Sequence, residues 1–365
     1  MFVSAERHSG AQGLVVLDPF CGTGATLSVA RQRGHRSIGI ELSHLGLLIA
    51  SVRLSPPADV NSALDFALEC SKVRRPMWYR PVSDDLVDWI GIRNAKFLSY
   101  FLMLMELVDD QRERNWLELA MSSALRSSSV WLPGSIKPQV DPARRPPDLR
   151  RNLRRSARRL ALDCILEQAA DRSPSALLLK GSATNLPLND QSVDAIITSP
   201  PYESMYDYFD VQRLSYMAFS WRAEKHMQIG RATGIARDGI GFVPPDSMVD
   251  WYVDRLRGEE TIAGRALRAY LRSLDNHLRE AFRVVRSGGS VAYAVANSIR
   301  FGTTFPLVDA IKELLSTAGF EKVRACKRKR TARAILPTGR NRKTGRFSSR
   351  PGVQVDERII YARRP

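Results

Sequence analysis

Apolar positions along the chain follow two patterns, short unbroken runs and runs with helical spacing. The short runs predict strands, and they lie at 14–17, 36–40, 176–179, 193–198, 290–296, 321–329 and 358–363. Helical spacing predicts helices at 25–33, 266–285 and 305–318. Strands that alternate with helices are typical of an α/β fold with a doubly wound, mostly parallel sheet. The last run is expected to be a strand antiparallel to its neighbour.

The strand pattern disappears between residues 56 and 173. Helical periodicity dominates at 95–108 and 111–126, and a link rich in Pro and Arg follows it. We therefore expect a helical insertion at 56–173 that divides a catalytic core into residues 1–55 and 174–365. The insertion is a candidate for target recognition, a brace or a dimer surface.

A glycine turn, DPFCGTG, joins the first predicted strand to the first helix. Gly22 and Gly24 let a backbone approach a ligand closely. The third glycine of a dinucleotide fingerprint is replaced by Leu27, but Glu41 ends the next strand, where an acidic residue commonly holds ribose hydroxyls. The turn lacks the Lys-Ser/Thr of a P-loop, which argues against a nucleoside triphosphate. The alternative is a purely structural tight turn.

A second turn, TSPPY, follows the strand at 193–198. Proline has no N–H and a fixed φ, and it pushes Ser199 toward extended geometry. The turn is therefore stiff, with carbonyls and the Ser199 hydroxyl as acceptors and the flat ring of Tyr202 beside them. These groups suit a planar ligand with an amino group, such as a nucleobase. The alternative is a proline-terminated strand followed by a core tyrosine.

The chain of 365 residues has a formal net charge of +17, which is typical of proteins that bind nucleic acid. Residues 321–365 hold 15 Lys or Arg against 3 Asp or Glu, and we interpret this tail as a phosphate-contacting loop. Arginine pairs recur every four residues at 150–159, on one face of a predicted helix. A solvated helix face and a basic loop without a specific partner are the alternatives.

Other features of the sequence bear on cellular location, membrane insertion and metal binding. The cysteines, Cys21, Cys70, Cys164 and Cys326, lack metal-ligand spacing and fit a reducing, cytoplasmic location. The first residues lack the apolar core of a signal peptide. The apolar run at 97–108 is too short to span a membrane. The five histidines form no ligand pattern, and we expect them to have no role in the chemistry.

Together, VLDPFCGTGAT and TSPPY resemble motifs of the S-adenosylmethionine-dependent DNA amino-methyltransferases, which methylate cytosine-N4 or adenine-N6. The resemblance extends through IGIELSHLGLLIA, GSATNLPLNDQSVDAIITSPPY and RVVRSGGSVAYAVAN, and it covers the catalytic core. It implies a Rossmann-like class I methyltransferase fold. The order of the two motifs, cofactor before catalytic, differs from that of many TSPPY enzymes.

The resemblance also implies roles for individual residues. S-adenosylmethionine would lie against the residues that match the cofactor motif, which are Asp18, Pro19, Phe20, Gly22, Gly24 and Glu41. The catalytic motif would be Ser199, Pro200, Pro201 and Tyr202. A base flipped out of double-stranded DNA would stack on Tyr202 while Ser199 and the Pro200 carbonyl accept its amino hydrogens.

Serine before the two prolines is commoner in cytosine-N4 enzymes, so cytosine is favoured over adenine. RNA is the alternative polymer. A catalytically silent nucleic-acid-binding subunit is the alternative class of protein, although its cofactor and catalytic motifs are intact.

Overall fold

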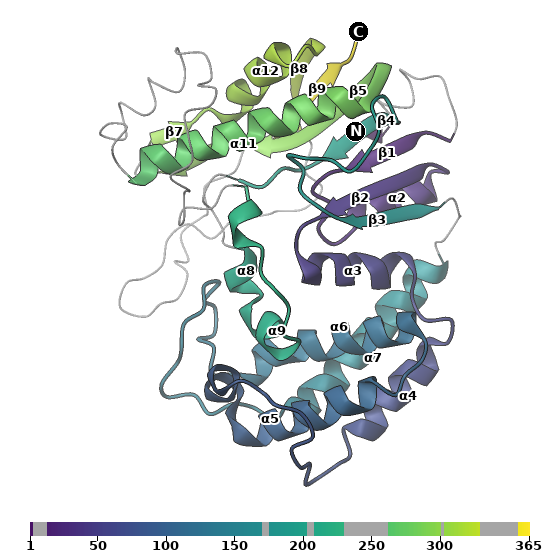
Figure 1. Ribbon diagram of the computed structural model, residues 1–365, viewed down its shortest axis with the longest axis vertical. Helices are drawn as coiled ribbons and strands as arrows, with labels where there is room; N and C mark the ends of the chain where they lie inside the picture. Colours follow the sequence, from purple (N-terminus) through teal and green to yellow (C-terminus); the bar gives the residue numbers. More distant parts are fainter. Residues whose placement is uncertain (3–12, 170–174, 203–207, 230–261, 301–302, 329–356) are drawn as a thin grey trace.

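The computed structural model describes residues 1–2, 13–169, 175–202, 208–229, 262–300, 303–328 and 357–365. These residues form a seven-stranded sheet with its helices and, beside it, a layer made only of helices (Figure 1). The doubly wound α/β prediction is confirmed.

The strand order is β3-β2-β1-β4-β5-β9-β8. The strands are β1 (Val15–Asp18), β2 (Arg36–Glu41), β3 (Ala176–Lys180), β4 (Val193–Thr198), β5 (Val285–Ala296), β8 (Glu321–Lys327) and β9 (Glu357–Arg363). Neighbours from β3 to β5 pair in parallel, and β9 is antiparallel to both β5 and β8. The predicted antiparallel last strand is therefore confirmed. Parallel strands that share one direction bring the loops after β1, β2, β3 and β4 to one edge.

Apolar spacing explains how the helices cover the sheet. In α11 (Ile262–Val284), Leu267, Leu271, Leu274 and Leu278 recur on one face and are all buried. The helix α12 (Leu307–Thr317) shares their apolar cluster, which also includes residues of β4 and β5. The helix α2 (Ala25–Gln32) follows β1, and α3 (His44–Leu54) lies between the sheet and the helical layer (Figure 1). A short hairpin, β6 (Ser298–Arg300) and β7 (Thr303–Phe305), follows β5.

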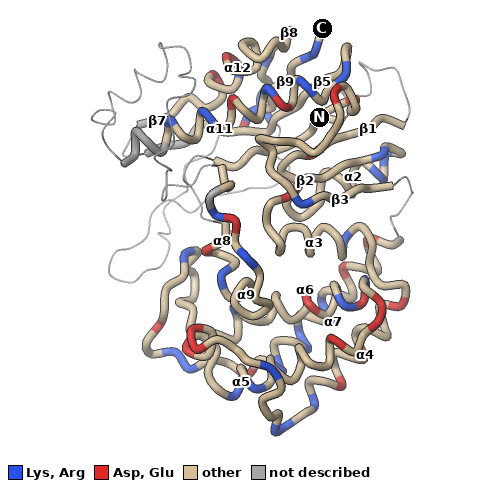
Figure 2. Tube along the Cα trace, in the orientation of Figure 1, with Lys and Arg blue, Asp and Glu red and all other residues tan. Residues whose placement is uncertain are grey.

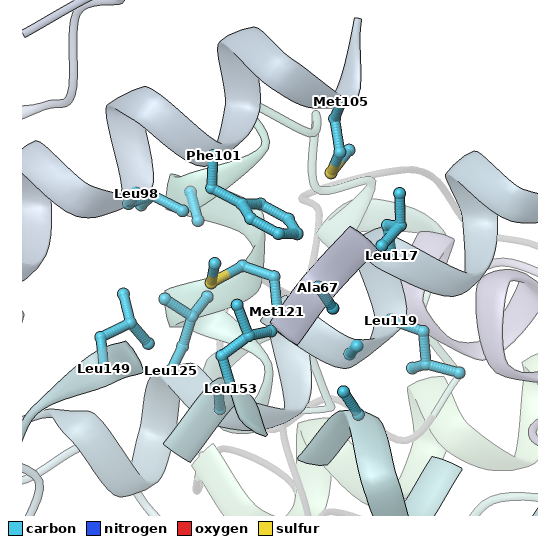
Figure 3. Packing of buried hydrophobic residues seen from close by; sticks show 14 of the residues in the cluster. Ala67, Leu98, Phe101, Met105, Leu117, Leu119, Met121, Leu125, Leu149 and Leu153 are labelled. Carbon is cyan, nitrogen blue, oxygen red and sulfur yellow. The ribbon is translucent and has the colours of Figure 1, made fainter. Parts of the chain in front are cut away.

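The helical layer contains α4 (Val60–Cys70), α5 (Asp84–Met105), α6 (Gln111–Leu125) and α7 (Leu149–Ala169). Its core is built by apolar side chains of these helices, among them Phe101, Met121 and Leu153 (Figure 3). Leu48 of α3 and Leu214 of α9 (Arg213–Ala218) belong to the same core. The helices α4 to α7 thus fall within the predicted insertion, while its limits at 55 and 173 remain predictions.

One expected strand begins earlier than predicted. The strand expected at 290–296 is part of β5, which starts at Val285 and includes Gly288 and Gly289. A Cβ at Gly289 would come within 2.8 Å of the Asp194 carbonyl oxygen, and Gly288 has a φ of +75°. The pairing of β4 with β5 shifts register between Val193 and Ala195. The glycines therefore permit a bulge and a close approach of two strands.

The described residues contain no helix long and apolar enough to cross a membrane. They also contain no group of three His, Cys, Asp or Glu side chains placed to hold a metal ion. Most of the predicted basic loop, residues 329–356, lies outside the described ranges.

Candidate functional site

A cavity of about 360 Å³ opens at the carboxyl edge of the sheet. This volume lies within the usual range of small-molecule sites. The cavity walls are the loops after β1, β2, β3 and β4 together with α8 (Tyr208–Val211) and residues 227–229. In Figure 1, α8 lies opposite the ends of β2 and β3. Both sequence motifs therefore meet in one cavity.

The predicted cofactor residues divide into lining and supporting residues. Pro19, Phe20, Gly22 and Glu41 line the cavity, whereas Asp18 and Gly24 do not. Gly24 has a φ of +74°, and a Cβ there would lie 3.1 Å from the Cβ of Ala50. Its role in the structure is the packing of the loop on α3.

Glu41 ends β2 with its carboxylate on the cavity wall. Each oxygen accepts one backbone N–H, from Gly22 and from Ser43, both at 2.8 Å. Burial raises the pKa of Glu41, and these two hydrogen bonds oppose that rise. A carboxylate oxygen has two lone pairs, so each can accept a further hydrogen bond from a ligand hydroxyl.

Asp18 connects the two motifs beneath the cavity. It is 4% exposed, and its Oδ1 accepts the hydroxyl of Thr198 at 2.6 Å and the Phe20 N–H at 3.1 Å. Burial raises the pKa of Asp18, while the bonds from Thr198 and Thr26 lower it. Thr198 immediately precedes Ser199, so the glycine loop after β1 and the proline turn after β4 are joined by one buried hydrogen bond.

In the proline turn after β4, Ser199 and Pro201 line the cavity. The Ser199 hydroxyl donates to the Ala294 carbonyl at 3.0 Å, which leaves the hydroxyl oxygen as an acceptor. The hydroxyl of Tyr270 on α11 donates to the Pro201 carbonyl at 3.1 Å and fixes the turn from behind. Pro200 is buried, and half-buried Tyr202 packs against the core beneath the sheet rather than lining the cavity.

The segment after the turn closes the other side of the cavity. Tyr208, Phe209 and Gln212 line it, and Phe209 packs edge-on against Tyr216 at 5.3 Å. Gln212 accepts the Ser43 hydroxyl at 2.6 Å, which ties this wall to the start of α3. Residues 203–207, between the proline turn and α8, lie outside the described ranges.

Sequence reasoning missed the wall at Gly181–Ala183 and the histidine behind it. His277 is fully buried, with Nδ1 3.0 Å from the Ala183 carbonyl and Nε2 3.0 Å from the Tyr293 hydroxyl. A carbonyl only accepts, so Nδ1 carries the proton and Nε2 accepts from tyrosine. Burial lowers the pKa of His277 to about 4, so the ring is neutral. Its ring also packs edge-to-face with Phe20, with 4.8 Å between the centroids. A residue expected to have no role thus links the loops after β1 and β3 to strand β5.

The cavity can hold a ligand with a ribose and a polar tail, because a carboxylate, a glycine loop and apolar rings surround it. S-adenosylmethionine has these parts. Ser199 and Pro201 line the same cavity as the predicted cofactor residues Pro19, Phe20, Gly22 and Glu41.

A sheet with a glycine loop, an acidic residue and an acceptor turn at its carboxyl edge is typical of S-adenosylmethionine-dependent methyltransferases. Residues 7–49 match a family model for N6- and N4-methyltransferases, described as DNA methylase. The match confirms the resemblance to the DNA amino-methyltransferase family over the segment that contains the glycine loop and Glu41.

Solved structures show weaker likeness. A putative DNA modification methylase from Thermus thermophilus, in complex with S-adenosylmethionine, is 18% identical over 51% of this chain and 54% of its own, with a TM-score of 0.25. A TehB-like methyltransferase from Corynebacterium glutamicum is 8% identical over 99% of this chain and 87% of its own, with a TM-score of 0.31. A putative rRNA methylase from Clostridium thermocellum is 9% identical over 100% and 96%, with a TM-score of 0.35. At these scores they support no conclusion for this chain. No curated protein matches it.

Proposed function

We propose that this protein methylates an exocyclic amine of a base in double-stranded DNA, with cytosine-N4 favoured over adenine-N6. The observation that carries the proposal is the Ser199 hydroxyl, which lies on the cavity wall with its proton held by Ala294. An oxygen fixed as an acceptor there can bind an amino hydrogen of a base. The DNA methylase match of residues 7–49 supports DNA as the substrate.

In this mechanism the chain positions and orients the reactants. S-adenosylmethionine supplies an electrophilic methyl group when bound. Pro19, Phe20, Gly22 and Glu41 would hold it against the β1 and β2 edge. Ser199 and the proline turn would hold the amino group so that its nitrogen lone pair faces the methyl carbon. The nitrogen would form a C–N bond to the methyl group that the cofactor supplies as its C–S bond breaks, and the amine would release one proton to water. Such a transfer depends on positioning and electrostatics.

Tyr202 has a distinct proposed role. We propose that it stacks on the flipped base, as the resemblance of its motif implies. In the structure it packs against the core and does not line the cavity. The preference for cytosine rests on the serine that precedes the two prolines.

The test is methyl transfer from labelled S-adenosylmethionine to unmethylated genomic DNA, with total RNA in parallel, followed by mass identification of the nucleosides. We expect N4-methylcytosine from DNA. N6-methyladenine would retain the DNA function and correct the base. Label found only in RNA would mean that the substrate is RNA rather than DNA. Failure to bind the cofactor would favour a catalytically silent nucleic-acid-binding subunit.

A further inference from the structure

The arginine stripe on α7 divides into two structurally different groups. Arg150 and Arg154 turn toward the end of α4 and bind there. Four others are exposed along α7, and these are Arg151, Arg155, Arg158 and Arg159.

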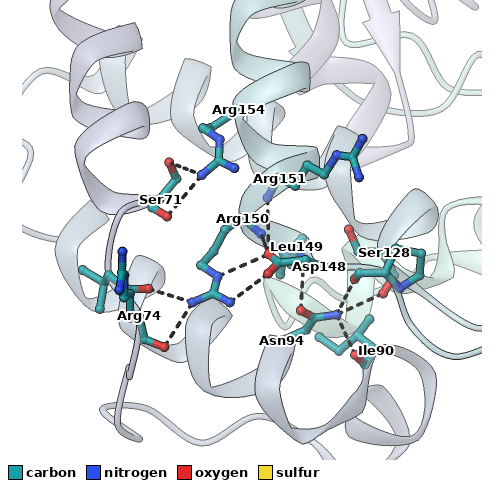
Figure 4. A network of polar contacts seen from close by, with 12 residues as sticks. Ser71, Arg74, Ile90, Asn94, Ser128, Asp148, Leu149, Arg150, Arg151 and Arg154 are labelled. Atoms are coloured by element: carbon teal, nitrogen blue, oxygen red, sulfur yellow. Dashed lines mark hydrogen bonds and ion pairs between the residues drawn. The ribbon is translucent and has the colours of Figure 1, made fainter.

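The first group has an internal role. Arg150 donates to the carbonyls of Val73 and Arg74 at 2.9 and 3.1 Å and pairs with Asp148 at 2.8 Å (Figure 4). Arg154 approaches the Ser71 hydroxyl at 3.3 Å. These guanidiniums bind backbone and side-chain oxygens at the end of α4 and in the segment that follows it. The guanidiniums of Arg150 and Arg154 thus have partners within the protein.

The second group has no such use. Within the described chain, no hydrogen bond or ion pair involves the side chains of these four arginines. Arg151 and Arg155 are four residues apart, as are Arg155 and Arg159, so like charges repel along the helix. Arg151 also lies in the first turn, where a cation opposes the helix dipole. This row of positive charges is therefore unfavourable for the isolated helix, and binding of a polyanion would relieve the repulsion between them.

The loop between α4 and α5 extends this surface. Arg74 and Arg75 are exposed, and Trp78 beside them is 43% exposed. Figure 2 shows the basic residues of this loop at the lower end of the helical layer. The loop is held in place, because the buried Ser99 hydroxyl accepts the N–H groups of Tyr79 and Arg80 at 2.8 and 2.7 Å. An ordered loop that presents arginines next to an exposed indole is typical of nucleic-acid contacts.

We propose that this surface binds the phosphodiester backbone of double-stranded DNA away from the catalytic cavity. We call it the α4–α7 basic surface, and it consists of Arg74, Arg75, Arg151, Arg155, Arg158 and Arg159. Planar guanidiniums bind phosphate oxygens in pairs, and phosphate contacts fix register without reading sequence. The choice of DNA rests on the proposed function.

The test compares two full-length triple variants in fluorescence anisotropy titrations with a random DNA duplex over a series of salt concentrations. The test variant is R151Q/R155Q/R158Q. The control is R36Q/R93Q/R112Q, which neutralises three arginines that are also exposed, on β2, α5 and α6. We expect the test variant to bind about tenfold more weakly near 0.1 M salt, with a log–log salt slope shallower by roughly two to three. The control should keep a slope closer to that of the wild type.

A second variant, R74Q/R75Q, tests the loop half of the surface separately and should flatten the slope by roughly one to two. Thermal unfolding and cofactor binding should remain unchanged in all variants, since these side chains are exposed. Wild-type slopes in both R151Q/R155Q/R158Q and R74Q/R75Q would overturn the proposal, as would equal losses in the control. Wild-type protein that binds DNA through this surface but methylates no DNA would overturn the proposed function alone. A slope change only with duplex RNA would reject both.

Discussion

At the residue scale, the hydrogen bond from Ser199 to Ala294 has a direct consequence for turnover. Replacing Ser199 with alanine removes the fixed acceptor, so the turnover number should fall about tenfold to a hundredfold. S-adenosylmethionine affinity should stay near the wild-type value, because the cofactor loop keeps its own contacts. Single-turnover methylation and calorimetry measure the two quantities.

The matched control is Ser199→Thr, which keeps a hydroxyl and should recover part of the rate. Normal turnover in Ser199→Ala would show that the hydroxyl does not bind the reacting amine.

His277 gives a prediction about cofactor binding. His277→Phe keeps a flat ring but leaves the Ala183 carbonyl and the Tyr293 hydroxyl without their partner. We expect S-adenosylmethionine affinity to fall about tenfold, since Ala183 lines the cavity. Tyr293→Phe removes only one link and should cost less. A double variant whose loss is the simple sum of both would contradict the idea of one shared network.

Glu118 on α6 predicts a pH dependence of stability. Burial raises its pKa to about 7, against the opposing hydrogen bond from Trp221. A carboxyl with a raised folded-state pKa stabilises the fold most below its unfolded value of 4.5, and this stability is lost as pH rises through 7. Glu118→Gln should therefore raise the free energy of unfolding at pH 8 by up to about 3 kcal/mol. Urea unfolding at pH 8 and pH 5 measures it, and an equal gain at both pH values would contradict this origin.

The sequence could predict the two motifs but only part of the site. Gly22, Glu41 and Ser199 were found because each follows a strand in a recognisable local pattern. Gly181–Ala183 and His277 carry no such pattern. They contribute through contacts between residues 94 positions apart, such as Ala183 and His277, which no local sequence feature encodes.

At the element scale, Asn94 joins three segments of the helical layer. Its side-chain amide donates to the carbonyls of Ile90, Ser128 and Pro147, and its oxygen accepts the Leu149 N–H at 3.0 Å (Figure 4). Asn94→Ala leaves buried backbone groups without partners, so the free energy of unfolding should fall by about 2–4 kcal/mol.

Asn94→Asp is the informative comparison in the same thermal or urea unfolding experiment. It keeps the acceptor for Leu149 but places an acceptor against three carbonyls, so it should destabilise at least as much as alanine at neutral pH. An aspartate variant as stable as the wild type would show that the donor bonds contribute little.

The elements themselves were largely predictable. The helices expected at 266–285 and 305–318 correspond to α11 and α12. They could be predicted because apolar residues at helical spacing form one buried face on each helix. The helix expected at 95–108 is the second part of α5, which starts at Asp84 and bends at Gly91. Gly91 has a φ of +76° within that helix, and a Cβ there would lie 3.3 Å from the ring of Pro146. The bend therefore depends on tertiary packing. The earlier start of β5, at Val285 rather than at residue 290, could not be predicted for the same reason. Both features depend on packing against a neighbouring segment.

At the scale of the whole molecule, the sheet and the helical layer share elements. The α3 residues Leu48 and Val52 and the α9 residue Leu214 belong to the helical core. The helix α3 also lines the cavity, as does Gln212, which precedes α9. We therefore expect one unfolding transition that S-adenosylmethionine shifts as a whole. At a hundred times its Kd the cofactor should add about 2.7 kcal/mol.

Differential scanning calorimetry with and without S-adenosylmethionine makes this measurement. Glu41→Ala is the control, in which the shift should shrink. Two transitions, of which the cofactor moves only one, would mean that the helical layer unfolds independently.

The hydrogen bond from Thr198 to Asp18 couples the loop after β1 to the turn after β4. We expect a ligand that orders either segment to favour the ordered conformation of the other. Thermodynamic linkage then requires that cofactor and target base strengthen or weaken each other's binding by the same factor. In the proposed reaction, the two products would likewise change each other's affinity by one common factor through this buried hydroxyl.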